Sequence, residues 1–112
     1  MTAKKPDTSK ADISAENFSA VRQFLRGYLH QDWQDEYETP AEAAQQFCED
    51  ADGEERQQVA LEWIAFCQQT KNLSLPVIAT LLSDKLGASW HLKSPEELEA
   101  ISVIFRPFAR KI

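Results

Sequence analysis

The sequence predicts an all-α protein, a compact bundle of about five helices. The 112 residues include only three glycines. Apolar residues recur three and four positions apart, and no segment alternates apolar and polar residues as a half-buried strand does. The apolar fraction of 43% is enough to build a core. Because no single apolar stripe can bury itself, the helices must pack against one another.

The first helix is expected from about Ser14 or Asn17 to about His30. Its apolar residues lie at positions 18, 21, 24, 25, 28 and 29, which share one face of a helix. Trp33 lies just past its expected end.

The second helix has the best-formed start signal. Residues 39–42 read Thr-Pro-Ala-Glu, which offers a threonine N-cap, a proline in the first turn and a glutamate three residues after the cap. This predicts a short helix through Phe47. The polar run of residues 49–55 is expected to form a loop and to cap a third helix, whose apolar stripe runs from Val59 to Cys67.

Two further starts and two stops organise the rest of the chain. Residues 74–76, Ser-Leu-Pro, open a fourth helix, and Gly87 is expected to end it in a left-handed conformation. Residues 94–97, Ser-Pro-Glu-Glu, form a capping box for the last helix. Pro107 cannot donate a backbone hydrogen bond, so this helix should kink or end near it.

Residues 1–13 are expected to form a flexible polar leader, followed by a single helical domain over residues 14–112. The leader has positive charge but no apolar stretch behind it, so it is not a secretory signal. No window approaches the roughly 20 apolar residues that a membrane span requires. Cys48 and Cys67 are too few for a disulfide framework and are predicted to be reduced thiols in the core. We therefore expect a soluble, cytoplasmic protein.

The sequence contains no pattern typical of catalysis or of metal or cofactor binding. His30 and His91 stand far apart, with no Cys or Ser arrangement between them. Neither belongs to a zinc motif, and residues 49–55 lack the ligand periodicity of a calcium loop. A glycine-rich phosphate loop is also missing. We expect a binding module that is not an enzyme and uses no metal or cofactor.

The distribution of charge points to the kind of partner. The net charge of −6 disfavours nucleic acid and anionic membranes. Residues 32–62 carry eleven acidic residues against Arg56 alone, a net charge of −10, while the stretches on either side each carry +2. Such a segment attracts a basic partner, although it can also serve only solubility. The aromatic residues Trp33 and Tyr37 within it favour an interface. The candidate binding residues are Asp35, Glu36, Glu38, Glu42, Glu49, Asp50, Asp52, Glu54 and Glu55.

A short motif connects the first two predicted helices. Residues 27–33 read Gly-Tyr-Leu-His-Gln-Asp-Trp. By structure alone, Tyr28 and Trp33 are expected to fill the core, and His30 to lie near a helix C-terminus, where a protonated imidazole is favoured. The Asp32 side chain is expected to cap a turn or to accept a hydrogen bond from a backbone N–H.

Together with the Thr-Pro-Ala-Glu-Ala-Ala of residues 39–44, this motif resembles the small helical immunity proteins of contact-dependent growth inhibition (CDI) systems. The resemblance covers residues about 18–70. Members of that family look like Gly-Tyr-Phe-His-Gln-Asp-Trp, an acidic loop, then Ser/Thr-Pro-Glu-Glu-Ala; Leu29 stands where an aromatic residue is expected. The resemblance implies mainly structural roles for Tyr28, His30, Gln31, Asp32 and Trp33.

The resemblance also implies a function. The protein would bind the cognate C-terminal toxin domain of a CDI effector and neutralise it by stoichiometric occlusion, as a monomer in a 1:1 heterodimer. Such toxins are often nucleases, whose active sites must be basic to hold phosphate, and the acidic segment would answer that charge. The alternative is a small acidic regulatory or adaptor protein that binds a basic protein without neutralising a toxin.

Overall fold

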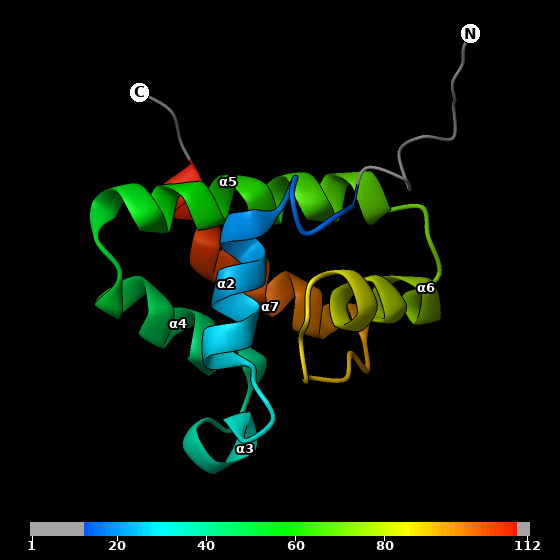
Figure 1. Ribbon diagram of the computed structural model, residues 1–112, viewed down its shortest axis with the longest axis horizontal. Coiled ribbons are helices and arrows are strands. Elements are labelled where there is room, and N and C mark those ends of the chain that lie inside the picture. The colour runs from blue at the N-terminus through cyan, green and yellow to red at the C-terminus, as the bar shows by residue number, and fades with distance from the viewer. Residues whose placement is uncertain (1–12, 110–112) are drawn as a thin grey trace, which may run out of the picture.

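The computed structural model describes residues 13–109, which form helices and no strands (Figure 1). This confirms the all-α fold class. Helix α2 crosses the middle of the molecule from α5 toward α4, α3 lies at the end opposite α5, and α7 packs against both α4 and α5. The elements are α2 (Ser19–Tyr28), α3 (Trp33–Glu36), α4 (Pro40–Asp50), α5 (Gly53–Thr70), α6 (Leu75–Thr80), the π-helical η1 (Leu81–Lys85), α7 (Pro95–Phe105) and the 3₁₀-helical η2 (Arg106–Ala109).

Helix α2 begins at Ser19, later than predicted, because Ser14 holds a separate turn before it. The Ser14 hydroxyl accepts a hydrogen bond from the Asn17 N–H at 3.1 Å. Ile13, the last residue of the predicted leader, is buried in the core with 2% of its surface exposed. The rest of that leader, residues 1–12, lies outside the described residues.

The start of α2 is capped by a residue of another helix. Glu62 of α5 accepts hydrogen bonds at Oε1 from the N–H groups of Ala20 and Val21, at 2.9 and 3.1 Å. These amides are among those that a helix leaves without an internal partner, and a carboxylate at this end also suits the helix dipole. Glu62 therefore does not add to the free negative surface, although it belongs to the acidic segment of the sequence.

One helical turn, α3, was not predicted from the sequence. Trp33 lies in this turn and packs against the core, with 9% of its surface exposed. The start of α4 follows the prediction more closely, because Thr39 Oγ1 accepts a hydrogen bond from the Glu42 N–H at 3.2 Å. The Glu42 carboxylate bonds back to the N–H of Glu38 at 2.9 Å, one residue before the cap.

The prediction of a loop over residues 49–55 is wrong. Helix α4 continues through Asp50, and α5 begins at Gly53, so only two residues separate the helices. The run does cap the third helix, as predicted: its residue Asp52 is the N-cap of α5, and its Oδ1 accepts a hydrogen bond from the Glu55 N–H at 2.8 Å. The run stays helical on both sides because the polar residues at its centre satisfy a helix end instead of interrupting one.

The fourth predicted helix is present as α6 and η1. Ser74 caps α6 through a hydrogen bond from the Val77 N–H to its hydroxyl, at 3.4 Å. The last five residues adopt π-helical geometry, and Gly87 follows with a φ of 77°, which confirms the predicted left-handed glycine. Residues 88–94 then return along the bundle, where the Ser89 N–H donates to the Leu29 carbonyl oxygen at 2.9 Å.

The capping box predicted for the last helix is only half formed. The Ser94 side chain makes no capping hydrogen bond, whereas the Glu97 carboxylate accepts from the Lys93 N–H at 2.7 Å. Helix α7 ends at Phe105 and continues as the 3₁₀ turn η2, in agreement with the break predicted at Pro107.

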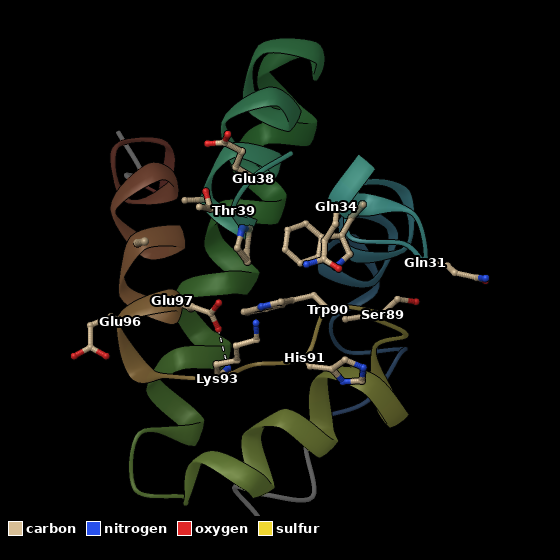
Figure 2. Close-up of a pocket in the computed structure, with 15 residues that line it drawn as sticks. Gln31, Gln34, Glu38, Thr39, Ser89, Trp90, His91, Lys93, Glu96 and Glu97 are labelled. Carbon is tan, nitrogen blue, oxygen red and sulfur yellow. Dashed lines mark hydrogen bonds between the residues drawn. The ribbon is translucent and has the colours of Figure 1, made fainter. Parts of the chain in front are cut away.

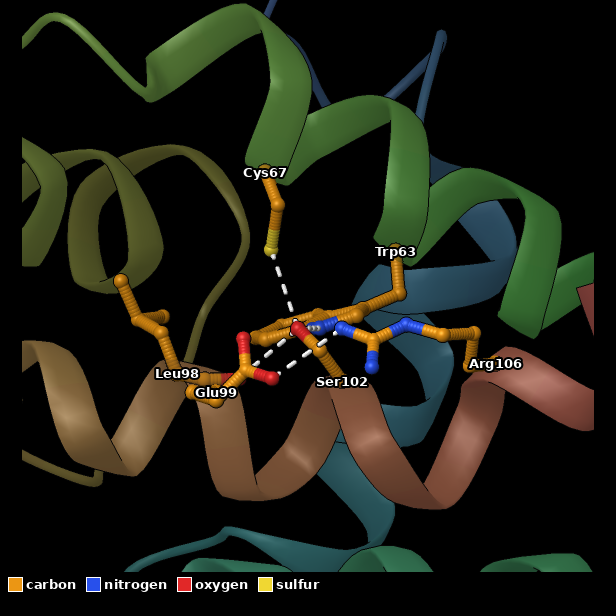
Figure 3. Close-up of polar contacts among 6 residues, drawn as sticks. All are labelled: Trp63, Cys67, Leu98, Glu99, Ser102 and Arg106. Atoms are coloured by element: carbon orange, nitrogen blue, oxygen red, sulfur yellow. Dashed lines mark hydrogen bonds and ion pairs between the residues drawn. The ribbon is translucent and has the colours of Figure 1, made fainter.

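The core combines aromatic packing with one polar network. Phe24 of α2 lies 5.2 Å from Phe47 of α4 and 5.4 Å from Phe105 of α7, between ring centroids. Between α5 and α7, the Trp63 Nε1–H donates to Ser102 Oγ at 3.0 Å (Figure 3). The Ser102 hydroxyl is in turn 2.8 Å from the carbonyl oxygen of Leu98, to which it donates. The Trp63 N–H and the Ser102 hydroxyl therefore both have hydrogen-bond partners.

Candidate functional site

The nine acidic residues predicted to bind a partner are all exposed. Across residues 13–109, none of them forms an ion pair with a lysine or arginine. The imidazole of His30 is the basic group that lies nearest to one of them, with its Nε2 atom 3.6 Å from Glu36 Oε1. The negative charge of this surface is thus not neutralised by the described part of the chain.

The acidic residues form two clusters at opposite ends of α4. The 11 residues of this helix span about 16 Å. The N-terminal acidic cluster consists of Asp35, Glu36, Glu38 and Glu42. The C-terminal acidic cluster consists of Glu49, Asp50, Asp52, Glu54 and Glu55.

Several of these carboxylates already have hydrogen-bond partners in the fold. Asp50 accepts from the Tyr28 hydroxyl at 2.8 Å and from the Gln46 amide at 2.9 Å. Glu42 and Asp52 accept from backbone N–H groups near helix starts, as described above, and Glu49 lies 3.4 Å from the Gln45 amide nitrogen. Within residues 13–109, the carboxylates without a hydrogen bond or ion pair are those of Asp35, Glu38, Glu54 and Glu55.

The motif residues differ in burial: Gln31 and Asp32 are exposed, and His30 is half-buried. Trp33 is buried, while Tyr28 is half-buried and stacks on Phe24, with 5.9 Å between the ring centroids. His30 lies just beyond α2 and accepts at Nδ1 from the Asp32 N–H at 3.1 Å. The prediction that the Asp32 side chain caps a turn is wrong: it makes no capping hydrogen bond, because its backbone holds that turn.

Two tyrosines are protonated well above neutral pH. Burial, followed by the hydrogen bond to Asp50, raises the pKa of Tyr28 to about 12. Burial also raises the pKa of Tyr37, with a smaller contribution from Glu36. The Tyr28 hydroxyl therefore remains a hydrogen-bond donor to Asp50 throughout the physiological range.

A cleft of about 840 Å³ lies beside the N-terminal acidic cluster. Its volume is within the range of about 300–1,000 Å³ that is typical of ligand sites. Gln34, Glu38 and Thr39 stand on one side of it, and Trp90 and Lys93 on the other (Figure 2). The cleft has an apolar centre and a charged rim. Its apolar lining residues are Trp33, Pro40, Ala41, Ala88, Trp90 and Ala100.

Trp90 carries a hydrogen-bond donor without a partner in the described part of the chain. The residue is 2% exposed, and its Nε1 atom is buried with no acceptor among residues 13–109. In Figure 2 its ring extends across the cleft toward Glu97 and Lys93, whereas Gln31 points away. Trp90 is not among the binding residues predicted from the sequence. The one sign of it in the sequence is a tryptophan in the short stretch between Gly87 and Pro95.

The two cysteines are free thiols, Cys48 buried and Cys67 half-buried. Burial raises the pKa of both, which leaves little of the reactive thiolate at neutral pH. Among residues 13–109, no three His, Cys, Asp or Glu side chains are placed to hold a metal ion. None of the helices in this range is long and apolar enough to cross a bilayer.

A match to a model of a known protein family identifies the family of this chain. The model of the CdiI immunity protein family matches residues 17–101. The chain belongs to the CdiI immunity protein family. The match extends well beyond residues 18–70, over which the sequence resemblance was drawn, and includes the cleft segment around Trp90. No curated protein and no solved structure matches the chain.

As a CdiI immunity protein, the chain neutralises a toxin, and its partner is the cognate toxin of a CDI system. Immunity proteins of this family are generally not enzymes, so the acidic surface and the cleft are interpreted as binding surfaces. The family model spans both acidic clusters and both walls of the cleft.

Proposed function

We propose that this immunity protein works in the cytoplasm by covering the active site of a basic, nucleic-acid-cleaving toxin domain with its acidic surface, in a 1:1 complex. One observation carries the proposal: nine exposed carboxylates flank α4, and none is paired with a lysine or arginine in the described residues. Like charges gathered in this way repel one another, and a basic partner relieves that repulsion.

The chemistry of nucleases supplies the complementary surface. A nuclease must neutralise the phosphates of its substrate, so its active-site cleft is lined with lysine and arginine. An acidic inhibitor competes for the same side chains and speeds the encounter through long-range attraction. A stable complex of this kind buries about 1,600 Å² in total. Both acidic clusters, at the two ends of a helix about 16 Å long, fall within the span of such an interface.

The test uses the C-terminal toxin domain encoded immediately upstream of the immunity protein. We expect a tight 1:1 complex by calorimetry and loss of the toxin's nuclease activity at equimolar immunity protein. A failure to form a complex at micromolar concentration overturns the proposal. A complex with a toxin that does not cleave nucleic acid overturns its nuclease part.

The electrostatic part is tested with the carboxylates that have no other role. Neutralising Glu54 and Glu55 together with glutamine should slow association at low salt by about threefold to tenfold, with little effect at high salt. The matched control, Glu16→Gln with Asp84→Asn, removes the same charge from exposed positions outside both clusters. If the two double variants associate at the same rate, the C-terminal acidic cluster does not steer the toxin.

A further inference from the structure

We propose that the cleft receives a loop of the toxin, with a main-chain carbonyl oxygen of that loop accepting a hydrogen bond from Trp90 Nε1–H and a basic side chain of the same loop pairing with Glu38. This inference rests on the proposed function, and it names the part of the surface that forms the desolvated centre of the interface.

The unused donor is the first argument. A buried N–H without a partner costs about 1–3 kcal/mol, and native proteins contain few such groups. Trp90 Nε1 is one of them, at the wall of a cleft of about 840 Å³. The group that satisfies it must be a hydrogen-bond acceptor. The side chain of Lys93 lies alongside the ring (Figure 2) and is exposed. The inference requires this side chain to move aside, so that the N–H opens to the cleft.

The charge at the rim is the second argument. Glu38 lines the cleft, and its carboxylate has no hydrogen-bond or ion-pair partner among residues 13–109. Asp35 and Glu36 extend the negative surface along α3, and both are exposed. A free anionic occupant would meet this repulsion, whereas a main-chain carbonyl oxygen carries no net charge. A loop that brings this carbonyl together with a lysine or arginine satisfies both the donor and the acid.

The arrangement also matches the anatomy of tight interfaces. Their binding energy is concentrated in desolvated pockets with aromatic residues, which a charged rim surrounds. Here Trp33 and Trp90 supply the aromatic walls, and Ala41 and Ala100 leave the volume that an inserted loop requires. Two smaller pockets, of about 500 and 320 Å³, are also formed by residues 13–109, and neither is lined by a residue of the C-terminal acidic cluster.

The first experiment follows the indole N–H signals of the ¹⁵N-labelled full chain during titration with the upstream-encoded toxin domain. The chain has three tryptophans, and single Trp→Phe variants assign their signals. We expect the Trp90 signal to move downfield and to become protected from solvent exchange. The Trp63 signal should stay in place, because its N–H is already bonded to Ser102. An unmoved Trp90 signal in a saturated complex overturns the inference.

The second experiment fills the cleft. Ala100 is exposed on α7 and lines the cleft, so Ala100→Phe should fold normally and weaken toxin binding by about tenfold or more. The matched control is Val103→Phe on the same helix, at a residue 52% exposed and outside the cleft lining. Circular dichroism and thermal melts verify both folds. Equal affinity of the two variants overturns the inference.

The third experiment removes one charge. Glu38→Gln should weaken binding several-fold and reduce its salt dependence, relative to Glu16→Gln, which removes an exposed charge elsewhere. Equal effects of the two variants remove Glu38 from the inference. Binding of the toxin to the wild-type chain separates the two proposals. A complex in which the cleft stays empty contradicts only the proposal of an inserted loop. The absence of any complex contradicts the proposed function as well.

Discussion

Trp63 and Trp90 are buried to nearly the same degree, with 0% and 2% of their surfaces exposed, but their indole N–H groups have opposite situations. The Trp63 N–H donates to Ser102 in the seam between α5 and α7. The Trp90 N–H has no partner within residues 13–109 and lies beside the cleft. Two tryptophans with nearly equal burial therefore differ in hydrogen bonding. The chain itself supplies the acceptor for Trp63, whereas the N–H at the cleft wall is left to bond another molecule.

The surroundings of the two side chains explain this difference. Trp63 packs between Phe66 and Phe105, at centroid distances of 5.7 and 6.3 Å, so its ring has neighbours from two helices. Trp90 comes from the stretch between Gly87 and Pro95, where no regular helix forms. A local departure from complete hydrogen bonding is expected at functional sites, where the fold accepts a cost in stability.

The strongest test of the comparison is the loss of the seam tryptophan. We expect Trp63→Ala to reduce the free energy of unfolding by about 3–5 kcal/mol, because it leaves a large cavity and removes the hydrogen bond from Trp63 to Ser102. Urea denaturation measures this change, and Val103→Ala, at an exposed position of α7, is the control. A loss below about 1 kcal/mol would mean that the seam is not the tightly packed region described here.

A smaller change removes only the Ser102 hydroxyl, the acceptor of the Trp63 N–H. Ser102→Ala should destabilise the protein by about 1–3 kcal/mol, because it turns the Trp63 N–H into a buried donor without a partner. Ser89→Ala is the control beside the cleft, since the exposed Ser89 side chain offers Trp90 no hydrogen bond. This control should change the free energy by less than about 0.5 kcal/mol. Similar urea midpoints for the two variants would contradict the contrast.

The rim of the cleft depends on a helix cap. Thr39→Ala should cost about 1 kcal/mol, because the Glu42 N–H loses its side-chain acceptor at the start of α4. Thr39→Ser keeps the hydroxyl and should retain most of the stability. Thermal unfolding compares the two variants, and equal losses would show that the methyl group of Thr39 matters more than its hydroxyl.

The smallest expected effect concerns pH. Burial raises the pKa of the Cys67 thiol above its ordinary value of 9.0, against a lowering contribution from its contact with Ser102. The folded state thus holds this proton more tightly than the unfolded state, so the associated stability is present below pH 9 and is lost as the pH rises further. Alkylation of Cys67 in a Cys48→Ala background should therefore be slow at pH 8. The alkylation rate should rise as the pH increases above 9, and alkylation at pH 8 as fast as that of an exposed thiol would contradict the assignment.

The helices were predictable from the sequence where local signals sufficed. Thr39 and the polar run around Asp52 cap helices as predicted, and Gly87 adopts the predicted left-handed conformation, because each of these features depends on a few neighbouring residues. The turn α3 was missed, since its four residues are too short to show a period and are held by the burial of Trp33.

The candidate site was less predictable, because it depends on distant parts of the chain. Counting charge along the sequence gave one acidic segment, whereas helix α4 separates its carboxylates into two clusters. Glu62 was counted with them, although its carboxylate bonds to the start of α2. The cleft was not foreseen at all, because it forms where α3 meets the stretch around Trp90 and the start of α7. No residue pattern within a single segment indicates that these segments pack together.

The Glu62 cap has a consequence for the folding pathway. It joins α5 to amides 42 and 41 residues earlier in the chain, so α2 receives this cap only once α5 has formed and docked. A short helix with an open first turn is marginal in water. The two segments should consequently open together in native-state hydrogen exchange, as one cooperative unit. In folding kinetics, a variant at Glu62 would report on the order of assembly of the bundle, independently of any partner.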